Sequence, residues 1–303
     1  MNIKIIPILS LCILSCFTNY AQFKAGLLNS LQEVYPDHNN LEFKKSFRTD
    51  IATNSYAEVH IIIESSIGNK ISIDTKSKNI SSINLEIIEP VPVEENTGLD
   101  SRTEQFQGKI NPYVIRRAPF DVFEIIYPLN EKSFITKHKY SLLRLSINSN
   151  NLINKKNYLI EISLKDNSKE IQNLNFKIKV HPASIPKLID SNFFYTNWFN
   201  INKMEEKHRL TRWDDKWYEM LEKYAKIMAD GRQNCVIIPG DLISLKDNRI
   251  HLDEEKMISF IDVFRKNGFK YFESPHLLGR GKNDDWGSPE LSTSLRGRGY
   301  FSE

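Results

Sequence analysis

Two patterns meet in the stretch NFKIKVHPASIP, residues 175–186. Its first six residues place an apolar side chain at every second position, which is the period of a β-strand with one buried and one solvated face. Its last six contain Pro182 and Pro186, which cannot continue a central strand because proline has no N–H to donate, and they are interpreted as a stiff linker. The stretch therefore predicts the end of a strand-rich domain, residues 23–182, and the start of a second domain, residues 187–303.

The same alternation recurs throughout the chain before this stretch. Short apolar and β-branched runs, separated by Asn, Ser, Lys and Gly, occur at residues 56–63, 71–75, 83–88, 122–127, 140–147 and 158–164. Many short strands without a helical pattern between them predict a β-sandwich. The segment 90–111 has neither period and is predicted to be a long exposed loop. The domain is interpreted as a structural or accessory module, and sugar binding by its exposed aromatic residues is the alternative.

After the linker, strand and helix patterns alternate. Buried strands are predicted at residues 193–199, 235–239 and 269–273, and amphipathic helices capped by Thr211 and Asp253 lie between them. Strands that alternate with helices pair in parallel through helical crossovers. Three strands and two helices are too few to close a barrel. The predicted fold class is therefore β plus α/β, with a β-sandwich followed by the start of an incomplete (β/α)8 TIM barrel.

Candidate site residues follow the predicted parallel strands, because function in such folds is located at the carboxyl ends of the strands. Asn197 and Trp198 lie at the carboxyl end of the first strand, Asp241 follows the second and His276 follows the third. A sugar presents an apolar ring face that stacks on an indole, and hydroxyl groups that hydrogen-bond to polar side chains. These four residues are candidate substrate-binding residues. The alternatives are that Trp198 belongs to the core and that His276 caps a loop.

The amino terminus has the pattern of an export signal, residues 1–22. Lys4 precedes a mostly apolar run without charged residues, residues 5–16, and Ala21 offers a small residue to cleave behind. The run is too short to span a bilayer. In the alternative interpretation Cys16 is lipidated and anchors the protein. Both predict a secreted, periplasmic or outer-membrane-surface protein, and cleavage after Ala21 leaves Cys235 without a thiol partner for an intramolecular disulfide.

Charge and composition exclude several classes of partner. The 41 Lys and Arg residues nearly balance the 38 Asp and Glu residues, which indicates neither a nucleic-acid groove nor a surface for acidic lipids. The strand-rich half gathers no His, Cys and carboxylate residues at metal-ligand spacing, and no Gly-rich loop follows the first strand of the second domain. No metal, cofactor or nucleic-acid partner is therefore predicted, and a glycan is the expected partner.

Three segments carry a resemblance to a known family. Residues 194–199, 213–217 and 228–234 resemble exported bacterial proteins of the DUF4091 group, which is related to glycoside hydrolase family 123. Upstream, residues 117–121 and 158–186 look similar to the β-sandwich that precedes the barrel in that group, so the resemblance covers most of the chain after the signal. It implies that Arg232 and Asn234 form part of the substrate mouth. Both are also explained as polar residues of a loop that leads into a strand.

The resemblance implies a reaction as well. Members of the family are thought to hydrolyse N-acetylgalactosaminides with retention, using the substrate's 2-acetamido oxygen as nucleophile, an Asp to orient it and a neighbouring Glu as acid/base. The two carboxyl groups need different environments, because one must stay protonated while the other stays charged. In the family this pair lies at a later barrel strand, which implies a position beyond residue 303 here. The Asp-Glu step at Asp253 and Glu254 starts a helix, where capping explains it better than catalysis.

We therefore expect an exported glycoside hydrolase-like protein that acts on glycans, with N-acetylhexosaminides as the substrates of the full-length product. The 303-residue chain is expected to be an amino-terminal fragment that does not hydrolyse them, because the catalytic pair is not in it. The alternative is a non-catalytic secreted carbohydrate-binding or structural module.

Overall fold

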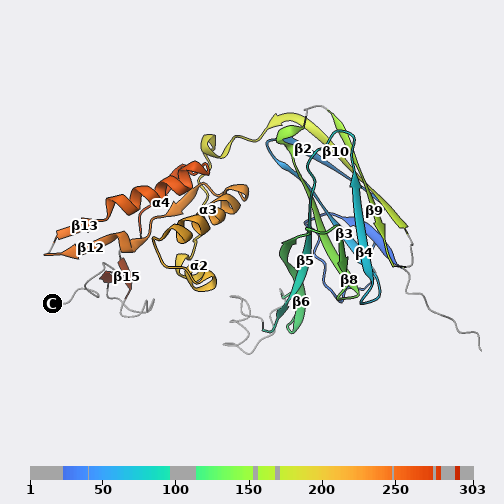
Figure 1. Ribbon diagram of the computed structural model, residues 1–303, viewed down its shortest axis with the longest axis horizontal. Coiled ribbons are helices and arrows are strands. Elements are labelled where there is room, and N and C mark those ends of the chain that lie inside the picture. Colours follow the sequence, from blue (N-terminus) through green and yellow to red (C-terminus); the bar gives the residue numbers. More distant parts are fainter. Residues whose placement is uncertain are drawn as a thin grey trace, which may run out of the picture. The chain divides into compact units, whose positions relative to one another are not determined.

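The computed structural model describes residues 23–39, 41–95, 114–152, 156–167, 171–247, 249–275, 278–280 and 291–293. The chain divides into two compact units between Ile185 and Pro186. The described part is mostly β-sheet, with three α-helices that all belong to the second unit (Figure 1). The predicted export signal, with Cys16, and the candidate His276 lie outside the described residues.

The first unit consists of two five-stranded sheets. One sheet has the order β1 (Lys24–Leu28), β3 (Tyr56–Glu64), β8 (Tyr140–Asn148), β5 (Asn84–Val93) and β6 (Phe120–Pro128), and all its neighbours are antiparallel. The other has the order β2 (Ser46–Thr53), β10 (Ile171–Ser184), β9 (Asn157–Lys165), β4 (Lys70–Lys76) and β7 (Ser133–Ile135). Here β10 pairs in parallel with β2 and the other pairs are antiparallel.

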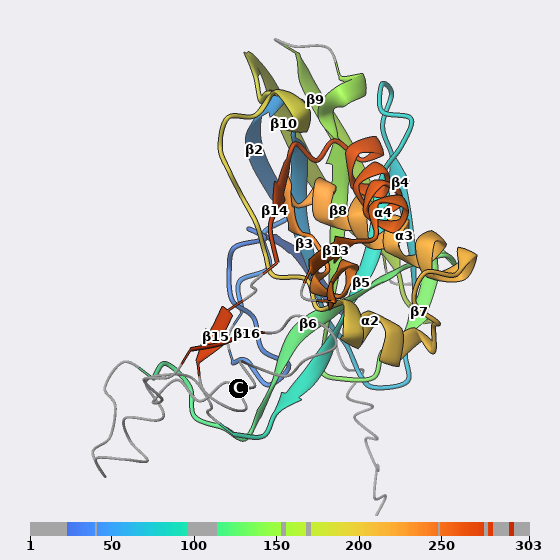
Figure 2. The same cartoon turned by 90° about the vertical axis from the view of Figure 1, so that its left-hand side faces the viewer.

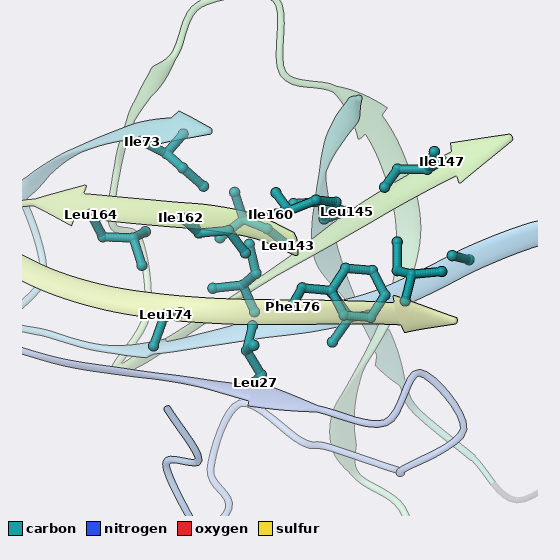
Figure 3. Packing of buried hydrophobic residues seen from close by; sticks show 14 of the residues in the cluster. Leu27, Ile73, Leu143, Leu145, Ile147, Ile160, Ile162, Leu164, Leu174 and Phe176 are labelled. Atoms are coloured by element: carbon teal, nitrogen blue, oxygen red, sulfur yellow. The ribbon is translucent and has the colours of Figure 1, made fainter. Parts of the chain in front are cut away.

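The two sheets share an apolar core. In β10 the predicted alternation is confirmed, because Phe176, Ile178 and Val180 are buried while the lysines between them lie on the other face. These side chains join those of the opposite sheet in one cluster, in which Figure 3 shows Phe176, Ile160 and Leu143. Each such side chain contributes roughly 1.5–3 kcal/mol on burial. With no disulfide among the described residues, burial holds this unit together.

The predicted linker at residues 181–186 is in part a strand. β10 continues through Pro182 to Ser184, with an irregularity in its pairing to β2 after Val180. Its pairing with β9 has already ended at Lys179, so the last residues of β10 have a neighbour on one side only. A proline is tolerated in such an edge position because no ladder bond is lost.

The loop predicted at residues 90–111 is wrong at its start, where residues 90–93 belong to a strand. β5 runs to Val93 through two prolines, and residues 96–113 lie outside the described residues. β5 pairs with β8 only as far as Ile88, and the rest pairs with β6 alone, with a bulge between Glu89 and Pro90. The prolines again fall where the strand has one neighbour.

The second unit contains α2 (Ile201–His208), α3 (Asp215–Asp230) and α4 (Glu254–Lys266). β11 (Cys235–Ile237) pairs in parallel with β14 (Tyr271–Glu273), as predicted. Two short antiparallel pairs are β12 (Ile243–Lys246) with β13 (Arg249–Leu252), and β15 (Leu278–Arg280) with β16 (Leu291–Thr293). One parallel pair is described, so the (β/α)8 barrel stays a prediction.

The two longer helices pack on each other through the apolar stripe expected from the sequence (Figures 1 and 2). Trp217 and Leu221 of α3 and Phe260 and Phe264 of α4 are buried in one cluster. Asp253 caps α4 as predicted, accepting a hydrogen bond from the backbone N–H of Lys256 at 3.2 Å. No helix in the described part of the chain is long and apolar enough to cross a bilayer.

Two local predictions for this unit are wrong. The cap of α3 is Asp214 rather than Thr211, because the Asp214 carboxylate accepts from the backbone N–H of Trp217 at 2.7 Å. Residues 193–199 form no strand, and Phe193 and Trp198 are 75% and 73% exposed. An aromatic run is therefore compatible with an extended surface segment as well as with a buried strand.

Gly26 of β1 allows a close approach of two backbones. A Cβ atom at Gly26 would lie 2.5 Å from the Cα of Phe43, and the backbone N–H of Leu27 donates to the carbonyl of Lys44 at 2.8 Å.

Since neither backbone can move away without losing this hydrogen bond, we expect Gly26→Ala to destabilise the first unit by about 1–3 kcal/mol. The measurement is denaturant unfolding followed by far-ultraviolet circular dichroism. Lys24→Ala on the same strand, at a half-exposed side chain, should change stability by less than about 0.5 kcal/mol; equal stability of the two variants would contradict the close-approach explanation.

A buried histidine lies beside a row of ion pairs on the first sheet. His60 of β3 is 9% exposed and stands opposite Arg144 of β8 in register. Arg144 Nε donates to Glu86 at 2.6 Å, and its Nη1 lies 3.6 Å from Glu58. Burial, with a smaller contribution from the Arg144 charge, lowers the pKa of His60 from 6.5 to about 4.

This shift predicts a pH dependence of stability. The unfolded chain takes up a proton on His60 near pH 6.5 and the folded chain only near pH 4, so the stabilisation is complete above pH 6.5 and is lost as the pH falls towards 4. The loss should be about 3 kcal/mol. We expect His60→Leu to flatten the unfolding free energy over this range relative to the wild type. His181→Gln, at a side chain that is 42% exposed, should keep the wild-type slope; an unchanged slope in His60→Leu would contradict the assignment.

Candidate functional site

The second unit contains a pocket of about 490 Å³. It is lined by residues 198–202, Arg212, residues 237–241 and Pro275. Two of these segments follow the carboxyl ends of the parallel strands: Asp241 comes after β11, and Pro275 comes after β14. The edge at which parallel α/β folds bind their ligands is therefore the edge that carries this pocket.

An arginine joins the pocket wall to helix α2. Arg212 Nη1 donates to Asp241 Oδ2 at 2.9 Å, and its Nε and Nη2 donate to the two carboxylate oxygens of Glu205 at 2.5 and 2.9 Å. Nη2 also donates to the side chain of Asn202. The hydrogen bond to Glu205 is the largest of the causes that raise the pKa of Arg212. Glu205, Arg212 and Asp241 are called the clamp below.

The clamp is continuous with the core of the unit. Glu205 Oε1 also accepts from the indole N–H of Trp217 at 2.8 Å, and Trp217 is fully buried in α3. The side chains of Glu205, Arg212 and Asp241 are 18%, 23% and 12% exposed. A partly buried ion-pair triad with a bidentate arginine is geometrically well defined, so the Asp241 carboxylate has a fixed position in the pocket.

Trp198 stands at the mouth of the pocket with 73% of its surface exposed. Its segment is fixed by Gln233, whose buried amide donates to the backbone carbonyls of Asn197 at 3.1 Å and of Cys235 at 2.8 Å. The indole is therefore presented on a tethered backbone rather than on a helix or strand. An exposed indole beside an oriented carboxylate can stack on an apolar ring and accept hydrogen bonds from hydroxyl groups.

Comparison with solved structures identifies a similar fold. A family 123 glycoside hydrolase from Clostridium perfringens, reported for glycolipid glycan hydrolysis, superposes with a TM-score of 0.66 at 14% identity. The alignment covers 84% of this chain and 48% of that chain. The fold is similar to that of a family 123 glycoside hydrolase. This chain spans about half the length of that enzyme.

Two other solved structures are much less similar to this chain. A PapD-like domain of human CEP192 has a TM-score of 0.24 at 7% identity, covering 54% of this chain and 87% of its own. A DUF4466 family protein from Parabacteroides merdae has a TM-score of 0.27 at 8% identity, covering 52% of this chain and 45% of its own. Both scores are too low to bear on the fold. No protein-family model and no curated protein matches the sequence.

Trp198 and Asp241 are the two candidate residues that the structure brings together in the pocket. Asn197 is directed elsewhere, since its side-chain amide donates to the hydroxyl of Tyr195 at 2.7 Å. Arg232, in the left-handed region at φ 68°, donates to the carbonyl of Pro186 at 2.7 Å. Neither residue belongs to the pocket lining.

Asn234 is fully buried and also lies outside the pocket lining. Its side chain bonds the backbone of the segment before Trp198, accepting from Tyr195 N at 2.9 Å and donating to Phe193 O at 2.7 Å. The structure thus agrees with the structural alternative for Asn234. Among the described residues, no group of three His, Cys, Asp or Glu side chains could hold a metal ion.

Sequence reasoning missed Arg212 and Glu205. α2 was not predicted, because Met204 is its one buried residue and its apolar pattern is weak. The available signal was Asn200, whose side chain caps the helix by accepting from Lys203 N at 3.0 Å. With α2 assigned, Glu205 and Arg212 would have been placed on either side of a helix end.

The clamp predicts a stability effect. Arg212→Ala leaves two partly buried carboxylates without their shared cation, so we expect a loss of about 2–3 kcal/mol in the unfolding free energy of the second unit. All four tryptophans of the sequence lie after residue 186, so tryptophan fluorescence during urea unfolding reports on this unit. Lys203→Ala removes an exposed ion pair with Glu206 and should cost less than about 0.5 kcal/mol. Equal losses for the two variants would show that the clamp contributes no more than a surface pair.

Proposed function

We propose that the second unit binds glycans in this pocket, and that the protein acts on glycans. One observation carries the proposal: the exposed indole of Trp198 and the clamped carboxylate of Asp241 line the same pocket. Sugar-binding sites need an aromatic platform for the apolar face of the ring and fixed polar groups for its hydroxyls. The pocket offers both.

The similarity of the fold to a family 123 glycoside hydrolase supports a glycan as the ligand class. More specifically, the proposed substrate is an N-acetylhexosaminide. The full-length product would cleave it with retention, with the substrate's acetamido group as nucleophile. The Asp-Glu pair for that reaction stays predicted beyond residue 303.

The site of action is proposed to be outside the cytoplasm. The motivation is the pattern of residues 1–22, a lysine followed by a short apolar run. Lipidation of Cys16 is the alternative to cleavage after Ala21, and mass spectrometry of the mature protein would distinguish the two.

A non-catalytic carbohydrate-binding role is the second candidate. It is favoured by the structural role of Asp253, the first residue of the Asp-Glu step. Its carboxylate caps α4 and pairs with the Lys256 ammonium at 2.8 Å. Both candidates require the same pocket to bind sugar, so the binding experiment comes before any assay of hydrolysis.

Trp198→Ala tests the pocket directly. Loss of an aromatic anchor should weaken binding of the methyl glycoside of N-acetylgalactosamine by roughly tenfold to thirtyfold in isothermal titration calorimetry. Stability should change by less than about 0.5 kcal/mol, because the indole is mostly exposed.

Phe193→Ala is the matched control. Phe193 is an equally exposed aromatic residue of the same extended segment, but it does not line the pocket. It should bind as the wild type does. Equal affinity of Trp198→Ala and the wild type, or an equal loss in both variants, would contradict sugar binding at this pocket.

A further inference from the structure

The charges of the clamp are unequal, and the nearby ammonium of Lys256, which interacts electrostatically with Asp241, is paired with Asp253 at 2.8 Å. The described lining of the pocket contains one cation, Arg212, and one anion, Asp241. Arg212 is also paired with Glu205, which lies behind the lining on α2. Two carboxylates therefore surround one guanidinium, and the clamp as a whole has one net negative charge.

The arginine has little hydrogen-bonding capacity left for a ligand. A guanidinium has five N–H groups. Hydrogen bonds occupy four of the five, two of them to Glu205, one to Asp241 and one to Asn202. Recognition of a carboxylate or sulfate by arginine normally uses two parallel N–H donors. Arg212 cannot offer such a pair without releasing one of its present acceptors.

We propose that Glu205 determines the specificity of the pocket, by neutralising and occupying Arg212 so that uncharged sugar rings bind and anionic sugars are rejected. This inference rests on the proposed function and narrows it to a class of sugar. Uronic acids, sialic acids and sulfated sugars belong to the rejected class, because their charge would lie near Asp241 without an available guanidinium fork.

The probes differ in one group. They are the methyl glycosides of N-acetylgalactosamine and of N-acetylgalactosaminuronic acid, which carries a carboxylate at C6 in place of the hydroxymethyl group. Repulsion between unit charges a few ångströms apart near a protein surface corresponds to at least about a tenfold difference in affinity. In calorimetry at low salt, we expect the neutral probe to bind at least about tenfold more tightly than the anionic probe. At roughly 0.5 M salt the ratio of the two affinities should be smaller, because exposed charges are screened.

Glu205→Gln removes the charge and keeps an acceptor for Arg212 and for the indole of Trp217. The preference for the neutral probe should fall by about tenfold. Glu206→Gln is the matched control, because Glu206 is the next residue on α2, is 58% exposed and pairs with Lys203 rather than Arg212. It makes the same change in net charge and should keep the wild-type preference.

The outcomes are distinguishable. Binding of the neutral probe with equal or tighter binding of the anionic probe would overturn the specificity inference and leave the proposed function standing. A preference that survives in Glu205→Gln, or falls equally in Glu206→Gln, would overturn the role of Glu205. If Glu205→Gln does not fold, the salt dependence in the wild type decides, and a preference independent of salt counts against the inference. Binding of neither probe would overturn the proposed function.

Discussion

The second unit depends on one buried amide, Asn234. Its side chain bonds the backbone of residues 193 and 195, its backbone N–H donates to Tyr195 O at 3.1 Å, and its carbonyl accepts from Lys270 N and Tyr271 N, each at 3.0 Å. The extended segment, the start of β11 and the start of β14 therefore meet at a single residue. Because unsatisfied buried backbone groups cost about 1–3 kcal/mol each, these bonds constrain the chain that carries Trp198 to the pocket.

The strands of the first unit could be predicted where one face is buried, because alternation records burial directly. The predicted ends of the strands at Pro90 and Pro182 were wrong. A proline lacks an N–H, but the sequence does not show whether a neighbouring strand would accept a hydrogen bond at that position. The run at residues 193–199 failed for a related reason. The aromatic residues show that the segment has a large apolar surface. Whether another element packs on Phe193 and buries it depends on the tertiary structure, and here Phe193 is exposed.

The pocket was predictable in part, for a similar physical reason. Trp198 lies near the end of one apolar run and Asp241 follows another, and the carboxyl edge of a parallel sheet is a general binding location. Asn234 has a residue type that suits sugar binding equally well, yet burial gives it a backbone-bonding role. Arg212 and Glu205 could not be found without α2. They are seven positions apart in the sequence, and their side chains meet because the chain reverses direction after the end of this helix.

Both units place an arginine between two carboxylates, with different consequences. On the first sheet Arg144 lies between Glu58 and Glu86, and burial, with a smaller contribution from the Arg144 charge, lowers the pKa of the neighbouring His60. In the second unit Arg212 receives both Glu205 and Asp241 as acceptors. The guanidinium engages both carboxylates, whereas glycoside hydrolysis requires a carboxyl group that donates a proton to the leaving group. The clamp is therefore suited to binding and orienting a sugar, and a general acid for its cleavage would have to come from residues outside the clamp.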